Sequence, residues 1–480
     1  MFVSITRPDQ IKDRNMQKKI NRHVMKPIGL ARRRKPKNEK IELVLRPEGP
    51  SSSTAVVLWQ TDDNVEYASN LYMRSIPSPR SADQELNYRH FSSRAHKILA
   101  FLREWDSPVC SMMRELSFTL AMMDDSAMHV ALALTLVFAQ EHKKHLLEES
   151  NKSLDHYNKS VSLVNQQITN IGNIVCDALV GVVITLACYD LCIFNLDRWV
   201  IHMTGLTRVV ELRGGFHKIS SRYLQTTIIW TSLTGSMMLD SPSFFEPAEE
   251  PLQGLGVSHH LGNVTSTLRK RLSNHPDICT LLESMSEFAT ATSEKSPWTN
   301  DPISKQKLQH IVSVMLKLPR YDILSVRDDG IALYEVLRLA SLFFLSGPSM
   351  RLAGNKDGNV IISYHRGRLP ILLRSYKVDW TGLEDLELWV LVIDGLVETG
   401  QDQEWVLGQI SRTMLMRKLN WDDVLGAVAR IAWADGRWTR TVDQLCADLE
   451  QRHGSSGWAL FPERGGISLM HPLEVGWGKS

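Results

Sequence analysis

Most of the chain after residue 80 repeats its apolar residues every three to five positions, which is the spacing of one face of an α-helix. In the first such stretch these positions are Leu86, Phe91, Ala95, Leu99 and Leu102. Segments that alternate apolar and polar residues do not separate the helical stretches, so a parallel sheet has no strands from which to be built. The pattern therefore predicts an all-α body.

The periodicity divides this body into helices joined by loops. The segment 174–194 is apolar on most sides, which is typical of a buried central helix. The next helix is expected to begin after Asp197 as its N-cap and to end at Gly214 or Gly215. Residues 240–262 are rich in Pro, Ser, Glu and Gly and are expected to form a long loop. Further helices are expected at 83–105, 127–147, 219–239, 262–273, 276–292, 303–317, 329–346, 382–397, 402–418, 420–433 and 438–451.

Three regions follow from these patterns. Residues 1–80 contain a basic run and clusters of Pro, Gly and Ser, and are expected to be a largely disordered arm and linker. Residues 81–452 are expected to form the multi-helix body, and residues 453–480 an irregular tail. We find no uncharged apolar run of the roughly 20 residues that a membrane span needs, so we expect no membrane contact.

The formal net charge of +2 is unevenly distributed. Residues 1–40 hold 13 Lys and Arg against three acids, a balance of +10, so the other 440 residues carry −8. Such a basic tract indicates an anionic partner or a nuclear address. Two basic clusters with twelve residues between them match the layout of a two-part nuclear import signal. They consist of Lys18, Lys19, Arg32, Arg33, Arg34, Lys35 and Lys37.

A second interpretation places the same cations on DNA phosphates, a contact that adds affinity without sequence information. No recognition helix and no interleaved aromatic residues accompany the basic run. Import is therefore the favoured interpretation, and non-specific DNA contact through the arm is the alternative.

The sequence lacks the common catalytic motifs. It has no phosphate-binding loop and no Gly-x-Ser-x-Gly motif, and Gly254 and Gly256 are only the start of a dinucleotide fingerprint. His142, His145 and Glu149 share a helix face, but the lysines between them favour a solvated surface over a zinc site. The six cysteines have no C-x-x-C spacing and are expected to be free thiols. We expect no metal, no cofactor and no enzymatic activity; a helical enzyme with an unrecognised site is the least favoured alternative.

Three ordered segments carry a family resemblance. Residues 199–215 have a His and a Gly-Leu pair inside a helix that ends in Arg-Gly-Gly; the others are 334–345 and 388–395, the last followed by tryptophans at 405 and 421. Together, over about residues 85–450, they resemble the fungal-specific transcription factor domain, the all-helical regulatory region of fungal zinc binuclear cluster activators. The motif residues are Trp199, His202, Gly205, Leu206, Arg213, Gly214, Gly215, Arg338 and Trp389.

The first motif also has a physical interpretation. Gly205 inside a helix costs about 1 kcal/mol relative to Ala, which suggests a close helix–helix approach. Arg213 lies in the last turn, where a cation complements the helix dipole. Either Gly214 or Gly215 is expected to supply the left-handed cap. We expect packing roles for His202 and Arg213, with ligand sensing as the alternative.

One departure from the family matters. Members that bind DNA by their own module hold two zinc ions with six clustered cysteines ahead of the helical domain, but no cysteine precedes Cys110 here. Zinc-dependent DNA recognition by this chain is therefore not expected. The resemblance implies a nuclear regulator of transcription, acting on metabolic or secondary-metabolite genes. It would work through other regulators or co-activators and a nuclear import receptor, and a homo- or heterodimer is compatible with this role.

Overall fold

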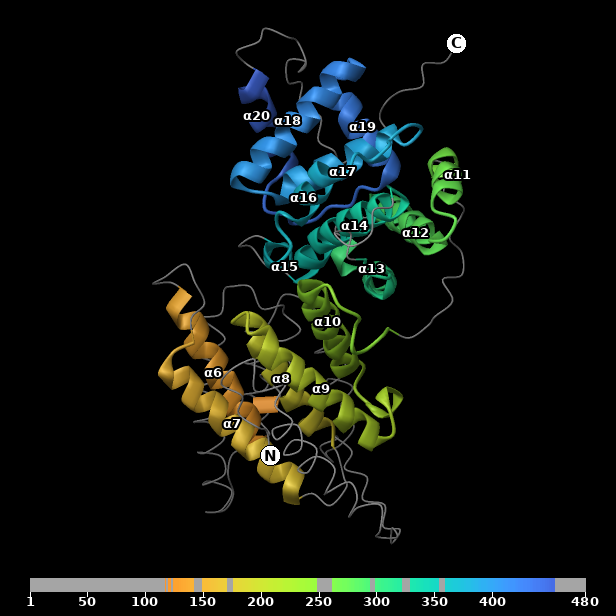
Figure 1. Cartoon of the computed structure of the whole chain (residues 1–480). Coiled ribbons are helices and arrows are strands. Elements are labelled where there is room, and N and C mark those ends of the chain that lie inside the picture. Colours follow the sequence, from red (N-terminus) through yellow and green to blue (C-terminus); the bar gives the residue numbers. More distant parts are fainter. Residues whose placement is uncertain are drawn as a thin grey trace. The chain divides into compact units, whose positions relative to one another are not determined.

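A computed structural model describes residues 117, 120, 121, 124–141, 149–170, 176–247, 261–293, 298–321, 329–353 and 359–453. These residues form fifteen α-helices and two short 3-10 helices and no β-strand, so the all-α fold is confirmed (Figure 1). The two basic clusters of the arm, the helix expected at 83–105 and the tail after residue 453 lie outside the described residues. The chain divides into two compact units, residues 1–228 and 229–480, and the division falls inside helix α10.

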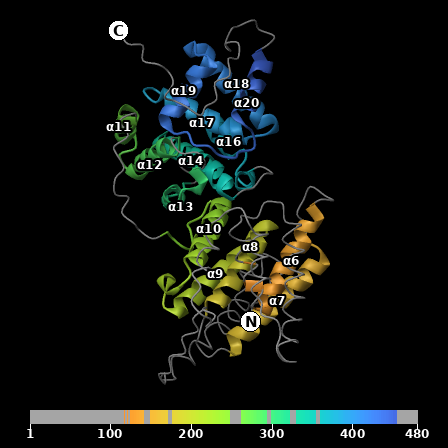
Figure 2. The same cartoon turned by 180° about the vertical axis from the view of Figure 1, so that it is seen from behind.

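The first unit is built around a buried helix. Its described helices are α6 (Asp125–Glu141), α7 (Asn151–Asn170), α8 (Asp177–Cys192), α9 (Leu196–Arg213), the 3-10 helix η2 (Phe216–Lys218) and the start of α10 (Arg222–Leu239). α6 packs against α7 and α8, and α8 packs along α9 (Figures 1 and 2). Thirteen of the sixteen residues of α8 are buried, which confirms the expected central helix.

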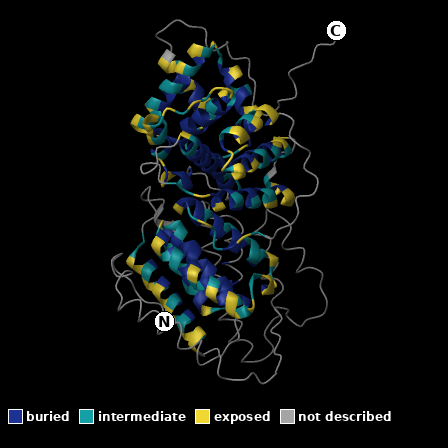
Figure 3. Ribbon diagram, turned by 45° about the vertical axis from the view of Figure 1, so that its right-hand side comes forward, coloured by how far each residue is buried: buried dark blue, intermediate teal, exposed yellow. Residues whose placement is uncertain are grey.

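The second unit is organised around α14 (Asp329–Ala353) and α17 (Glu384–Val397), which pack against each other. α12 and α13 also pack on α14, and α18 and α19 pack on α17. Dark blue buried residues line the inner faces of the helices in Figure 3, and exposed yellow residues lie outside. The other helices of this unit are α11 (Gly262–Arg271), α12 (Pro276–Ser293), α13 (Pro302–Lys317), α15 (Val360–Ser363), α16 (Arg368–Ser375), α18 (Gly400–Arg417), α19 (Trp421–Ile431) and α20 (Val442–His453), with the 3-10 helix η4 (Trp298–Asn300).

Helix α14 is longer than the expected helix at 329–346, because it continues to Ala353. The segment Asp329–Leu352 is long and apolar enough to cross a membrane. However, 89% of its most apolar 18-residue stretch is buried inside the protein. It is therefore accounted for as the core helix of the second unit. Pro348 lies inside it, and the carbonyl of Gly347 accepts a hydrogen bond from the backbone N–H of Arg437 at 2.9 Å.

Most of the expected helices that lie within the described residues are found, with ends displaced by a few residues. The N-cap assigned to Asp197 is wrong: Asn195 caps α9, because its side chain accepts from the backbone N–H of Arg198. The expected loop after α10 is confirmed for residues 240–247. Three helices were not expected, namely α7, α15 and α16.

Candidate functional site

The first family motif lies on α9, and several of its side chains are buried. Trp199, His202 and Leu206 are buried, and Gly205 is half-buried. The left-handed cap predicted at one of the two glycines is Gly214, with φ of 101°, and Gly215 follows with φ of 108°. Positive φ values of this kind favour glycine because it has no Cβ.

Arg213 ties the end of α9 to the start of α8. Its Nη2 lies 2.7 Å from the Asp177 carboxylate, and its Nε donates to the carbonyl of Lys218 at 3.1 Å. Asp177 also accepts from the backbone N–H and the hydroxyl of Ser220. Arg213 therefore fixes the turn that follows α9 in addition to complementing the helix dipole.

A buried polar cluster connects α9 with α7 and α8; we call it the Arg198 cluster. Arg198 Nε donates to Asp190 Oδ1 at 2.7 Å, and its Nη2 donates to Glu149 at 3.0 Å. The Tyr157 hydroxyl lies 2.6 Å from His202 Nε2 and donates to Asp190 at 3.3 Å. The guanidinium of Arg198 also lies over the Tyr157 ring, 4.2 Å from its centre, a cation–π arrangement.

His202 is the motif residue that enters this cluster. Burial, with the positive charge of Arg198, lowers the pKa of His202 to about 3. The imidazole is therefore neutral at physiological pH. A neutral histidine that is 3% exposed and hydrogen-bonded to a tyrosine is positioned for packing.

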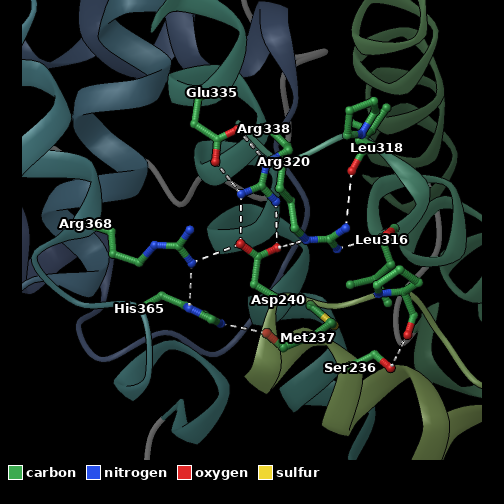
Figure 4. Close-up of polar contacts among 12 residues, drawn as sticks. Ser236, Met237, Asp240, Leu316, Leu318, Arg320, Glu335, Arg338, His365 and Arg368 are labelled. Atoms are coloured by element: carbon green, nitrogen blue, oxygen red, sulfur yellow. Dashed lines mark hydrogen bonds and ion pairs between the residues drawn. The ribbon is translucent and has the colours of Figure 1, made fainter. Parts of the chain in front are cut away.

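The second polar cluster is centred on Asp240, the residue after α10 (Figure 4). Arg338 Nη1 and Nη2 donate to its two carboxylate oxygens at 2.6 and 2.8 Å. Arg320 Nε donates to Oδ1 at 3.1 Å, and Arg368 Nη1 to Oδ2 at 2.9 Å. Three arginines from separate parts of the second unit thus share one carboxylate, and we call this group the Asp240 cluster.

Local backbone geometry places Asp240 at this point. Its φ of 48° is left-handed, a conformation that aspartate tolerates better than most residues. The backbone N–H of Asp240 bonds to the Met237 carbonyl, and that of Ser241 bonds to Ser236, so the turn closes the end of α10. The carboxylate is thereby directed toward α14.

The electrostatics of the Asp240 cluster favour the ionised state. Burial by itself would raise the pKa of Asp240, but hydrogen bonds from Arg338 and the charges of the three arginines lower it below the ordinary value. Glu335 adds a second acid, since Arg338 also donates to its oxygens at 2.9 and 2.5 Å. The predicted motif residue Arg338 is therefore a fully buried cation with paired charges.

The remaining motif residue, Trp389, is fully buried in α17 and its Nε1 donates to the Ala432 carbonyl at 2.9 Å. Five residues later in the same helix, Asp394 is fully buried, and neither of its carboxylate oxygens has a hydrogen-bond partner among the described residues. Burial and the neighbouring Glu398 raise the pKa of Asp394 well above its ordinary value. Folding therefore favours the protonated form of Asp394 relative to the unfolded chain.

A comparison with known families finds a match in the N-terminal part of the helical body. Residues 86–312 match the family model of the fungal specific transcription factor domain. This part of the chain is similar to a fungal-specific transcription factor domain. No curated protein and no solved structure matches the chain significantly.

The matched part of this transcription factor domain includes residues 199–215 and the whole Arg198 cluster. The two later segments that the sequence analysis assigned to the resemblance, 334–345 and 388–395, lie beyond residue 312. Arg338 and Trp389 therefore lie outside the match. The boundaries of the helical body, residues 81 and 452, stay a prediction.

No group of three or more His, Cys, Asp or Glu residues among the described residues could hold a metal ion. Glu149 pairs with Arg198, whereas His142 and His145 lie outside the described residues. The family itself suggests a regulator of transcription and not an enzyme.

The polar clusters were largely missed by the sequence analysis. Arg338 and His202 were singled out, but Asp240, Asp190 and Arg198 were not. Asp190 carried a signal, since an acid near the end of an otherwise apolar buried helix needs a cationic partner. Asp240 stood at the start of an expected loop, where nothing local marks a residue as buried.

Proposed function

We propose that this chain is a nuclear regulator of transcription that acts through protein partners. The family match over residues 86–312 carries the proposal, since it assigns a transcription factor domain. The acidic balance of the chain after residue 40, −8 overall, supports the role of partners, because it disfavours direct contact of the helical body with DNA phosphates. The helical body would dock on a regulator that is itself bound to DNA.

The role in transcription can be tested by tethering. The full chain would be fused to an unrelated DNA-binding module and its effect on a reporter gene measured, with the module alone as the control. We expect a change in reporter output of either sign. In parallel, selection from a random DNA duplex library should enrich no sequence motif with the unfused protein. An enriched motif would show direct recognition and overturn the partner-based role.

Nuclear import is assigned to the two basic clusters of the arm. Replacing Lys18, Lys19 and residues 32–35 and 37 with Gln should abolish nuclear accumulation of the tagged chain. A matched control replaces the exposed α7 lysines Lys152 and Lys159 with Gln, and should leave the distribution unchanged. Unaltered accumulation of the arm variant would remove the import role.

The second candidate function, DNA contact by the arm, is favoured by the +10 charge of residues 1–40. It predicts non-specific binding whose affinity falls steeply with salt, in proportion to the phosphates neutralised. Deleting residues 1–40 separates the two functions when an unrelated import signal is added back. If the added import signal restores the effect of the deleted variant on transcription, the arm serves import. If DNA retention stays lost, the arm contacts phosphates.

A further inference from the structure

Helix α16 leaves most of its side chains at the surface of the second unit. Only Leu369 and Pro370 are buried in it. Ile371 is 53% exposed, and Leu372 and Leu373 are half-buried. One exposed isoleucine is ordinary on a protein surface. Ile371 differs from an ordinary exposed isoleucine because two held arginines flank it on the helix.

Ile371 lies one helical turn from Arg368 and one turn from Arg374. Both arginines are anchored. Arg374 Nη1 lies 2.7 Å from Asp402, and its guanidinium stacks over the ring of Trp405 on α18, 4.6 Å from the ring centre.

Arg368 is held by Asp240 at 2.9 Å (Figure 4). The two side chains nevertheless remain 40% exposed for Arg368 and 37% exposed for Arg374. Held guanidiniums lose little rotamer freedom when they bind a second partner.

The charge of this stretch is opposite to that of the rest of the body. Residues 358–378 contain no Asp or Glu, whereas the chain after residue 40 carries −8 overall. The exposed Arg366 and Lys377 add two further cations around α16. An exposed apolar side chain between two held arginines, one of which stacks on a tryptophan, has the composition of an interface hot spot.

We propose that α16 is a docking surface for an acidic amphipathic helix of a partner protein. Charge complementarity selects this occupant: the apolar face of such a helix covers Ile371, and its flanking carboxylates pair with Arg368 and Arg374. The inference rests on the proposed function in one respect, namely that the partner is a protein.

The test uses the purified full chain and a synthetic probe. The probe is a fluorescein-labelled acidic peptide of about 20 residues, long enough to be helical, with leucines at helical spacing and glutamates elsewhere. Binding is measured by fluorescence anisotropy. A peptide of the same composition in scrambled order is the control for charge alone. We expect the patterned peptide to bind and the scrambled peptide to bind at least about tenfold more weakly.

Two variants place the binding on α16. Ile371→Ser and Arg374→Gln should each weaken binding about tenfold, as hot-spot truncations do. Their matched controls are Ile303→Ser on α13, where the isoleucine is 57% exposed, and Arg452→Gln on α20, where the ion-paired arginine side chain is 41% exposed. The controls should bind as the unchanged protein does. Equal losses in the controls would overturn the proposal, and thermal unfolding verifies that all four variants are folded.

Other occupants give distinct outcomes. A concentration-dependent dimer that Ile371→Ser abolishes, seen by sedimentation, would assign α16 to a second copy of the chain and overturn the proposal. Binding of duplex DNA that Arg374→Gln removes would also overturn it. Neither result bears on the reporter and localisation experiments, so failure here is distinguishable from failure of the proposed function.

Discussion

Arg338 on α14 donates from its two terminal nitrogens to both carboxylate oxygens of Asp240, a residue 98 positions earlier in the chain. Arg338 is fully buried and Asp240 is 8% exposed. Because α14 is the core helix of the second unit, this pair fastens the turn after α10 to that core. The cost of removing either partner follows from burial: without Arg338 the buried Glu335 loses the cation it pairs with, and without Asp240 three arginines lose the carboxylate that they share.

We expect Arg338→Met to lower the free energy of unfolding by about 3–5 kcal/mol. Replacing Asp240 by Asn should do the same, since it leaves three arginines without their carboxylate. Denaturant unfolding of both single variants and the double variant measures the coupling. A coupling energy near zero would show that the pair is not an energetic unit.

Asp394→Asn should stabilise the protein at neutral pH. The raised pKa means that the folded state holds a proton that the unfolded state has released above about pH 4, so the native protein loses stability as the pH rises from 4 toward 7. The amide removes this dependence. We expect a gain of about 1–3 kcal/mol at pH 7 and little gain at pH 4, measured by unfolding at both values. An equal effect at the two values would show that Asp394 is ionised in the folded state.

His202 predicts the opposite dependence on pH. Its pKa is lowered to about 3 in the folded state, so between about pH 6.5 and 3 the unfolded state binds the extra proton. Acidification from pH 7 to 5 should therefore destabilise the native protein through this residue. His202→Gln should show a shallower loss, compared by the difference between the two unfolding profiles. Parallel profiles would contradict a neutral buried imidazole.

Gly347 permits a close approach between α14 and the segment that follows α19. A Cβ at this position would lie 2.1 Å from the ring of Trp438. That indole is itself fixed, since its Nε1 donates to the Phe343 carbonyl at 3.0 Å. Gly347→Ala should therefore cost about 1–3 kcal/mol through overpacking. Gly426→Ala on α19 is the control.

The nearest atom to a Cβ at Gly426 is 3.6 Å away, on Arg430. This substitution should stabilise the helix by about 0.5–1 kcal/mol, the difference in helix propensity between Ala and Gly. Thermal unfolding of the two variants should thus show shifts of opposite sign. A tolerated alanine at Gly347 would mean that Trp438 can move aside.

The sequence predicts those helices whose apolar residues follow a clear local pattern, and it misses those that depend on tertiary contacts. α8 and α14 carry strong apolar runs and were expected. α7 was missed because it is polar overall, although Leu154, Tyr157 and Val164 do follow a helical stripe. α16 begins after a glycine and contains Pro370, both of which usually interrupt helices. Tertiary contacts with α14 and α18 accompany it, and these cannot be read from local spacing.

The partners of the buried polar residues could not be predicted from the sequence, for a different reason. The burial of Asp240 depends on arginines 80, 98 and 128 positions away. A local sequence pattern cannot show that residues so far apart along the chain will be in contact. His202 was correctly placed in a helix, but its hydrogen bond to Tyr157 depended on α7, which was not expected. The predicted residues are therefore those that mark a helix face, and the missed ones are their partners from distant segments.

Three guanidiniums share one carboxylate in the Asp240 cluster. We therefore expect substitution of the acid to destabilise the protein far more than substitution of Arg320 or Arg368. Arg320 and Arg368 both reach solvent, so the loss of either leaves the remaining pairs intact and the vacated space open to water. The loss of the acid instead leaves three like charges to repel one another around a single point. A saturation scan that scores the amount of folded protein should accordingly find position 240 close to invariant, while these two arginines accept many replacements.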